Sequence, residues 1–514
     1  MANSRQSIAR DGGRQHAGQK SPQEKTQGRI EKDALGEIKV GQGRYWGSFT
    51  QRALETFGWR EDENSIYYYM TYVKIKLACA RANHACGMLE TAKKTAIEQA
   101  CAQALDGGLA GQFPLGFYQA GAGTPFNMNV NEVIANRANE IMGAPLGSYR
   151  FVHPNNDVNM CQSSNDLGPT AIRVAMLELS RELEKSADAL CISLDSKAKK
   201  YAGMAKVGRT HLQDAVPVGI GQEIMAWSDS IKADMEAIER ARKELLEVPL
   251  GGTALGTGIA AHPEFAANAC AQLSKICNEN ISPMGNKHAG ISMLGPVLAY
   301  ASAIKRLDST LVKVSNDMKI LMSGPKAGIA ELLLPEVEPG SSIMPGKINP
   351  SVPEAVEIMA RDAMAKEHAI EQAAAGGQLQ LNVLTPLAAK NIIEMIKASE
   401  QAIALLDRKC VAGMEYDLAA CRANMDRTYV LATALNPYLG YQAMAEIVKE
   451  SLRTGKPVKD VVALHGLMGR DEMDGILNPA KLTSPQAIDQ KLAQKIRQSE
   501  SYKKYLQKTG KEPK

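Results

Sequence analysis

A proline-rich stretch beyond the middle of the chain carries residue types that could bind and deprotonate a small anion. It runs from Glu338 to Glu354 and holds two adjacent hydroxyls, Ser341 and Ser342, followed by Lys347 and Asn349. The prolines and glycines between them exclude a regular helix, so the stretch must be a loop. Such a loop can direct backbone N–H groups, hydroxyls and one cation toward a single anion. Composition alone fits a plain connector between two helices equally well.

Two polar segments in the first third of the chain have the composition of helix starts. Gly121 to Asn131 contains Thr124 and reads, on composition alone, as a turn that caps a helix at Glu132. His153 to Thr170 contains a run of hydroxyl and amide side chains, Ser163, Ser164 and Asn165. This run could be only an N-cap cluster. Because free N–H groups at a helix start favour anions, the same residues could also bind a ligand.

A third polar segment, Gly208 to Glu223, predicts a break between two helices and contains Thr210 and His211. A lone histidine is more often a surface or core residue than a functional one. The glycine-rich segment Pro249 to Gly258 does not indicate a dinucleotide site, because no strand precedes it and its glycines are not spaced as GxGxxG.

Helices must hold these segments. Aromatic residues make up only 5% of the chain, and apolar residues recur at steps of three and four. One such stripe comprises Ile172, Met176, Leu179, Leu183, Leu190 and Leu194. A second comprises Ile304, Leu307, Leu311, Val314, Met318 and Leu321. We therefore expect a mostly α protein whose core is a bundle of nearly parallel helices.

Composition disfavours several classes of protein. A net charge of +4 over 514 residues gives no case for a nucleic-acid partner. The nine cysteines form no CxxC pair and no Cys/His cluster in the sequence, so we expect reduced cytosolic thiols and no zinc site. The N-terminus lacks an apolar segment and no long apolar run follows, which disfavours secretion and membrane spanning and favours the cytoplasm.

The motifs together resemble a known family. GSSIMPGKINPSVPE, at Gly340 to Glu354, is similar to the signature loop of the aspartase/fumarase superfamily, whose members add or remove a group across the double bond of fumarate. QSSND at Gln162 to Asp166 resembles another of its characteristic strings. GAGTPFNMNVN and GRTHLQDAVPVGIGQE resemble two further substrate segments, and the likeness extends from about Arg29 to Leu482.

The resemblance implies an all-α, three-domain fold with a central long-helix bundle. Its expected parts are a disordered tail (1–28), an N-terminal helical domain (29–165), the bundle (166–425), a small C-terminal helical domain (426–482) and an extension (483–514). It also implies a homotetramer whose active sites are shared between subunits, a small dicarboxylate substrate, and neither a cofactor nor a metal.

By the same resemblance Ser341 is the base that removes a proton next to a carboxylate, and His211, paired with Glu354, helps to hold a substrate carboxylate. Deprotonation produces a dianionic enediolate, which needs preorganised donors. The implied substrate-binding residues are Thr124, Ser163, Ser164, Asn165, Thr210, Lys347 and Asn349.

The leading expectation is reversible elimination of ammonia from L-aspartate to give fumarate. GQLQLNV resembles aspartases, because fumarases usually place an aromatic residue at the position of Leu379 and an acid at that of Gln380. The alternatives are hydration of fumarate to L-malate, a lyase for another 2-substituted succinate, left open by IYYYMTYVK at Ile66 to Lys74, and a catalytically silent structural protein. The chain departs from the family at Ile259 to Ala261, where an asparagine is common.

Overall fold

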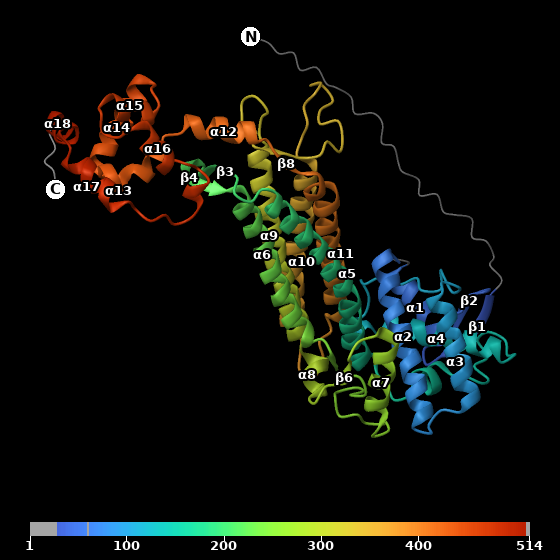
Figure 1. Ribbon diagram of the computed structural model, residues 1–514. Coiled ribbons are helices and arrows are strands. Elements are labelled where there is room, and N and C mark those ends of the chain that lie inside the picture. The colour runs from blue at the N-terminus through green and yellow to red at the C-terminus, as the bar shows by residue number, and fades with distance from the viewer. Residues whose placement is uncertain (1–27, 59–60, 510–514) are drawn as a thin grey trace, which may run out of the picture.

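The computed structural model describes residues 28–58 and 61–509, and these residues form an elongated, mostly helical molecule (Figure 1). The expected all-α fold is therefore confirmed. Within the described residues the strands form only two-stranded sheets. Of the expected N-terminal tail, residues 1–27 lie outside the described residues.

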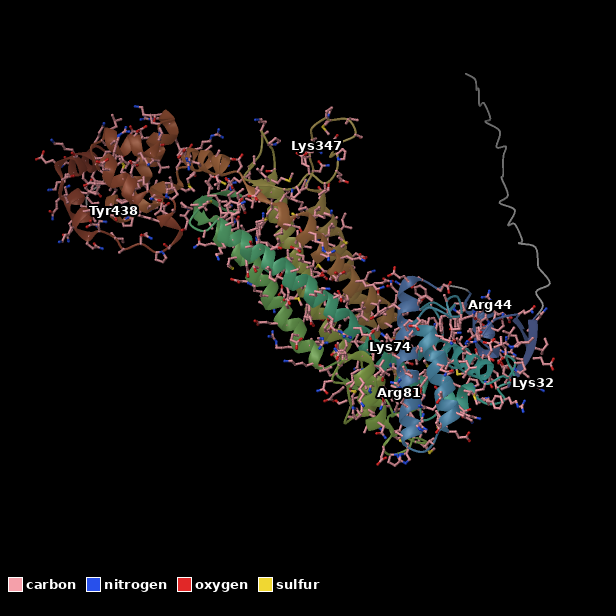
Figure 2. The ribbon with its side chains drawn as sticks, turned by 45° about the vertical axis from the view of Figure 1, so that its right-hand side comes forward. Lys32, Arg44, Lys74, Arg81, Lys347 and Tyr438 are labelled. Atoms are coloured by element: carbon pink, nitrogen blue, oxygen red, sulfur yellow. The ribbon has the colours of Figure 1, made fainter. Side chains whose placement is uncertain are left out.

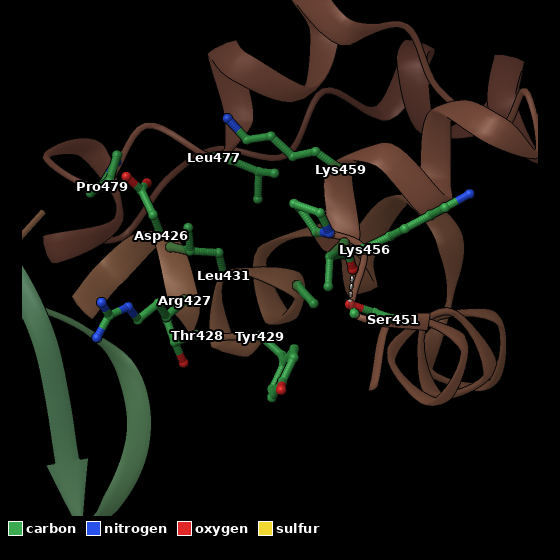
Figure 3. Close-up of a pocket in the computed structure, with 14 residues that line it drawn as sticks. Asp426, Arg427, Thr428, Tyr429, Leu431, Ser451, Lys456, Lys459, Leu477 and Pro479 are labelled. Carbon is green, nitrogen blue, oxygen red and sulfur yellow. Dashed lines mark hydrogen bonds between the residues drawn. The ribbon is translucent and has the colours of Figure 1, made fainter. Parts of the chain in front are cut away.

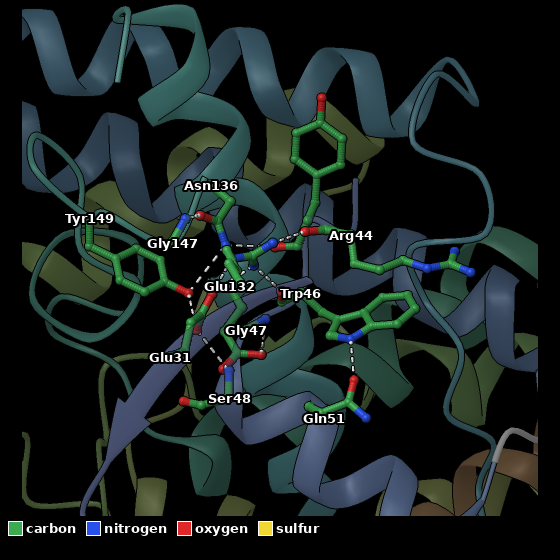
Figure 4. A network of polar contacts seen from close by, with 12 residues as sticks. Glu31, Arg44, Trp46, Gly47, Ser48, Gln51, Glu132, Asn136, Gly147 and Tyr149 are labelled. Atoms are coloured by element: carbon green, nitrogen blue, oxygen red, sulfur yellow. Dashed lines mark hydrogen bonds and ion pairs between the residues drawn. The ribbon is translucent and has the colours of Figure 1, made fainter. Parts of the chain in front are cut away.

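The N-terminal part is a β-hairpin packed on helices. Its elements are β1 (Gly28–Asp33), β2 (Gly36–Gly41), α1 (Ser48–Phe57), α2 (Glu63–Ala85), α3 (Thr91–Leu105) and α4 (Thr124–Ile141). β1 and β2 pair antiparallel, with Arg29 opposite Val40. The buried Glu132 carboxylate of α4 accepts hydrogen bonds from the N–H groups of Gly47 and Phe49 at 2.9 and 2.8 Å and thereby fixes the start of α1 (Figure 4).

The middle of the molecule is a bundle of long helices with short connecting elements. These are α5 (Ser164–Lys200), β3 (Ala205–Thr210), β4 (Gln213–Gly219), α6 (Ile220–Lys243), β5 (Glu247–Val248), α7 (Phe265–Cys277), β6 (Ser282–Pro283), α8 (Lys287–Ser292), α9 (Gly295–Met322), β7 (Leu332–Leu333), α10 (Ser351–Ala375), α11 (Thr385–Lys409) and β8 (Glu415–Tyr416). Five helices, α5, α6, α9, α10 and α11, run side by side (Figure 1). β3 and β4 form an antiparallel hairpin, β5 and β6 a parallel pair, and β7 and β8 an antiparallel pair.

The predicted apolar stripes form the core of this bundle. All six residues from Ile304 to Leu321 are buried in α9, and in α5 only Leu179 is partly exposed. The core is continuous from Val40 to Cys421, so the N-terminal part and the bundle share one apolar interior.

The C-terminal part has its own apolar core. Its helices are α12 (Leu418–Arg427), which links it to the bundle, α13 (Asn436–Leu439), α14 (Tyr441–Thr454), α15 (Val458–Leu464), α16 (Arg470–Ile476), α17 (Gln490–Gln498) and α18 (Glu500–Lys508). In the expected extension after residue 482, Ala493, Ile496 and Leu506 are buried in the same cluster as Leu435 and Ile447. The last two helices are amphipathic and close this core.

None of the helices among the described residues combines the length and the hydropathy that crossing a membrane requires.

Candidate active site

The loop that carries Ser341 folds back on its own backbone. The Ser341 hydroxyl oxygen accepts hydrogen bonds from the N–H groups of Ile343 at 3.2 Å and Met344 at 2.9 Å. Donors at this oxygen favour its ionised form over its protonated form, since they stabilise negative charge. Ser341 is half-buried whereas Ser342 is exposed, so the geometry distinguishes the two hydroxyls.

Lys347 and Asn349 close this loop. The Lys347 ammonium donates to Asn349 Oδ1 at 2.8 Å, and Asn349 Nδ2 donates to the carbonyl of Gly340 at 2.5 Å. A side chain at Gly340 would bring its Cβ within 2.1 Å of the Lys347 carbonyl oxygen, so only glycine fits here. The cation, the amide and Ser341 are thus held on one short loop before α10.

Thr210 and His211 lie on the exposed tip of the β3–β4 hairpin, where sequence predicted only a break between helices. Thr210 pairs with Gln213, which leaves His211 and Leu212 as a two-residue turn with φ of 54° and 59°. Both values belong to the left-handed region that such turns require and that usually selects Asn or Gly. Non-glycine residues in this region cost roughly 1–3 kcal/mol each and concentrate at functional sites.

The hairpin and the Ser341 loop occupy the same end of the bundle. Arg209 donates to both carboxylate oxygens of the buried Glu331 at 2.8 Å, which ties β3 to the chain just before the loop. Glu354 is exposed in the first turn of α10. Among the described residues no ion pair joins it to His211, so the expected pairing of these two side chains stays a prediction.

The predicted N-cap at Ser163 is present at the opposite end of the bundle. Ser163 Oγ accepts from Asn165 N–H at 3.2 Å, and the Asp166 carboxylate accepts from Ser163 N–H at 2.9 Å, which forms a reciprocal capping box at the start of α5. Ser164 and Asn165 are half-buried. Three short polar side chains therefore surround the positive end of a 37-residue helix.

Thr124 lies beside this helix start. The prediction of a turn that caps a helix at Glu132 is wrong, because α4 already begins at Thr124. Gly123, in a left-handed conformation, precedes the helix, and Pro125 lies in its first turn. Asn127, one turn into α4, donates from Nδ2 to Ser164 Oγ at 2.9 Å. Thr124 and Ser164 thus lie at two linked helix N-termini.

The glycine-rich segment after Pro249 packs against the same helix start. Asp166 Oδ2 accepts from the N–H groups of Gly251 and Thr253 at 3.0 and 2.9 Å. Asn165 Nδ2 donates to the carbonyl of Ala254 at 2.9 Å. Burial raises the pKa of Asp166 to about 7, against the lowering effect of these backbone donors.

Sequence reasoning missed Lys76, a fully buried lysine of α2 behind this segment. Its ammonium donates to Asn159 Oδ1 and Gln162 Oε1, both at 2.8 Å, and Asn159 Oδ1 also accepts from Asn127 at 3.2 Å. Burial lowers the pKa of Lys76 to about 7. The only signal in the sequence is the position of this lysine within a largely apolar helical run. That position does not identify the hydrogen-bond partners of Lys76.

The turn around Leu379, whose sequence resembles that of aspartases, lies at the same end of the bundle as the start of α5. Leu379, with φ of 52°, is 88% exposed at its tip, and Gln378 and Leu381 bridge its base. The carbonyl of Val383, just after the turn, accepts from Ala122 N–H at 3.1 Å, next to Thr124.

The predicted site residues therefore fall into two groups at opposite ends of the bundle. α5 spans roughly 55 Å and the 25-residue α10 roughly 37 Å at 1.5 Å per residue. Figure 2 shows Lys347 at the end near the C-terminal part, and Lys74 and Arg81 of α2 at the other end. One chain by itself does not bring Ser341 to Asn165.

A cavity of about 570 Å³ lies away from both groups, between α12 and the C-terminal part (Figure 3). It is lined by Arg427, Tyr429, Lys456 and Lys459 among others, and none of the predicted site residues lines it. The predicted site residues lie elsewhere, at the two ends of the helix bundle.

Comparisons with known proteins agree with these motifs. A protein family described as lyase matches residues 36–365, and one described as the fumarase C C-terminus matches residues 431–484. An aspartate ammonia-lyase from Pseudomonas canavaninivorans is 41% identical over 465 residues, which is 90% of this chain and 98% of the relative. A class II fumarate hydratase from Chromobacterium violaceum is 39% identical over 452 residues, 88% of this chain and 98% of the relative.

Solved structures share the fold. A fumarate lyase:delta crystallin from Brucella melitensis bound to cobalt has a TM-score of 0.86 and 38% identity, and the match covers 89% of this chain and 100% of that one. A class II fumarase from Schistosoma mansoni has a TM-score of 0.84 and 31% identity, with 90% and 100% covered.

Proposed function

The chain belongs to the aspartase/fumarase superfamily and is a lyase of that family, and we propose that its reaction is the reversible elimination of ammonia from L-aspartate to give fumarate. The observation that carries this choice is the turn at Leu379 and Gln380. Its sequence resembles aspartases, and through Val383 it adjoins the Thr124 segment. An aspartate ammonia-lyase is also among the relatives.

In the proposed mechanism Ser341 removes the proton from the carbon next to a carboxylate. A free serine hydroxyl is a weak acid, so its oxyanion needs stabilisation. The N–H groups of Ile343 and Met344 already point at Ser341 Oγ, and Lys347 supplies a positive charge on the same loop. No metal or organic cofactor enters this step.

The dicarboxylate is held at both ends of the reacting carbon pair. Thr124, Ser163, Ser164 and Asn165 present donors from two helix starts, where the helix dipole also favours an anion. Lys347, Asn349, Thr210 and His211 supply donors from the other surface, with Glu354 as the partner of His211. Donors fixed in advance stabilise the enediolate more than they stabilise the substrate.

We further propose that the active enzyme is a homotetramer whose sites combine segments of different subunits. The roughly 55 Å length of α5 supports this, because it keeps Asn165 and the His211 hairpin apart within one chain. Mixing Asn165→Ala with Ser341→Ala should restore part of the activity that each variant lacks, since some mixed sites contain both native residues. Mixed oligomers that remain inactive would contradict shared sites.

The test of the reaction is fumarate absorbance with the purified full-length protein. We expect fumarate from L-aspartate and not from L-malate. Fumarate from malate alone would replace the proposal with fumarate hydration, which the Chromobacterium violaceum relative favours at almost the same identity. A product from neither compound would favour a different 2-substituted succinate.

His211→Ala separates two roles for this residue. Weakened substrate binding with residual turnover would identify a carboxylate ligand, whereas lost turnover with unchanged binding would identify a base.

We assign the protein to the cytoplasm, because all nine cysteines are free, as expected in a reducing compartment.

A further inference from the structure

Three side chains with metal-binding atoms converge where α2 ends. They are Cys86, which caps the C-terminus of α2, and His262 and Glu264, which precede α7. One ligand atom of each lies within 4.8 Å of those of the other two. The sequence predicts no Cys/His cluster, and this one escapes such a prediction because it joins positions 176 residues apart, from 86 to 262.

We propose that Cys86, His262 and Glu264 bind a divalent metal of the zinc class. A thiolate and an imidazole are ligands of borderline-soft metals, whereas Mg²⁺ and Ca²⁺ prefer sites built of oxygen atoms. Three protein ligands and one water complete a tetrahedral Zn²⁺ site. The Cys86 thiol loses its proton when the metal binds, and that proton passes to solvent.

The arrangement is close to the geometry that such a metal needs. Zinc–ligand bonds of roughly 2.0–2.3 Å place neighbouring ligand atoms about 3.5 Å apart. The ligand atoms now lie within 4.8 Å of one another, so they must approach by at most about 1.3 Å. His262 and Glu264 sit on an irregular segment that can make this movement. His262 Nδ1 now accepts a long 3.2 Å hydrogen bond from Glu264 N–H, which a metal bond at this nitrogen would replace.

Access and orientation favour Cys86 among the nine cysteines. The other eight are buried, whereas Cys86 is partly exposed. Asn268 of α7 donates from Nδ2 to the Cys86 sulfur at 3.4 Å and orients it toward the α7 side, where His262 and Glu264 lie. Such outer partners support metal ligands in known sites.

A metal here would fasten the segment from Gly251 to Glu264 to α2. The beginning of this segment already contacts the substrate end of α5, through Asp166 and through the bond from Asn165 to Ala254. Its middle, Ile259 to Ala261, is where the chain departs from its family, and Ala260 has φ of 65°. The metal would therefore restrain a loop whose other end borders the candidate active site.

Metal binding can be tested on the full-length protein without any activity assay. Titration with Co²⁺ should give a thiolate-to-cobalt charge-transfer absorption band that saturates at one Co²⁺ per chain. Addition of Zn²⁺ should abolish the band, because Zn²⁺ displaces Co²⁺. Cys86→Ser should remove the band, and His262→Gln should weaken binding by roughly 100-fold or more, because loss of even a residue that only hydrogen-bonds to a metal ligand costs about 10–100-fold. Absence of the band in the wild-type protein would overturn the site.

His368→Gln is a matched control, because His368 Nδ1 lies 3.0 Å from a carboxylate oxygen of Glu371 but His368 belongs to no such three-residue group among the described residues. We expect unchanged metal affinity, and equal weakening in this variant would refute the assignment. Zn²⁺ should also slow backbone hydrogen exchange at residues 252–261. Unchanged exchange in the metal-bound protein would overturn the proposed restraint. Neither result depends on which lyase reaction the enzyme performs.

Discussion

Replacement of Lys76, the buried lysine of α2, should change the pH dependence of stability. Lys76 is fully buried, its hydrogen-bond partners are the neutral amides of Asn159 and Gln162, and its pKa is about 7 against 10.5 for an exposed lysine. At 1.36 kcal/mol per pKa unit, the difference between 10.5 and about 7 corresponds to about 5 kcal/mol of free energy.

The direction of the effect follows from proton binding. Between about pH 7 and 10.5 the unfolded chain holds the proton of Lys76 and the folded chain does not, so stability rises with pH in this window. Below about pH 7 both states are charged, and the folded state carries the full cost of the buried cation. Lys76→Met abolishes this dependence, because methionine keeps most of the length of the side chain without its charge.

The variant also loses hydrogen bonds. Gln162 Oε1, on a half-buried side chain, loses its donor, at a cost of at most about 1–3 kcal/mol, whereas Asn159 Oδ1 keeps its bond from Asn127. We therefore expect Lys76→Met to be more stable than the wild type at pH 6, by roughly 2–4 kcal/mol, and less stable near pH 10.

Thermal melting of both proteins across this range provides the assay, because titrations of groups that do not interact with Lys76 cancel in the difference between the two proteins. A wild type that is more stable than the variant at pH 6 would refute the reasoning. It would mean that Asp166, which raises the pKa of Lys76 through its charge, compensates the ammonium in an ion pair.

Three predictions concern the loop before α10. Ser341→Ala should lower kcat by roughly 10³-fold with an unchanged circular dichroism spectrum, while Ser342→Ala stays near wild type; the reverse order would move the base by one residue. Lys347→Ala should raise KM more than it lowers kcat, and Lys347→Arg should restore little, since a planar guanidinium does not replace a compact ammonium; unchanged kinetics would remove Lys347 from the site. Gly340→Ala should lower kcat without lowering the melting temperature, because its Cβ displaces the Lys347 carbonyl in an exposed loop; wild-type kcat would show that the loop need not keep this shape.

The features predicted from sequence are those with local causes. The helices follow from apolar periodicity, and Ser163 as an N-cap follows from side chains within four residues of it. The start of α4 was misplaced because the glycines and asparagines around Thr124 resemble a turn, although Pro125 suits a first helical turn.

Other features depend on contacts between distant segments and could not be predicted. The β3–β4 hairpin needs backbone pairing between its strands and a left-handed turn at His211 and Leu212. The residue types His and Leu do not predict such a turn. The partners of Lys76 lie more than 80 residues along the chain, and their amide side chains are common in loops. The roles of Ser341 and Lys347 rest on family resemblance, since spacing alone does not select a base.

The length of α5 has a consequence for how the gene can change. A single-residue insertion within this helix would rotate everything beyond it by about 100° and shift it by about 1.5 Å. The Ser163 cap stands at one end and the His211 hairpin follows the other, so such an insertion would misalign the two surfaces. Insertions and deletions in the bundle should therefore be eliminated by selection. Loops of the C-terminal part, which has a separate core, should accept them.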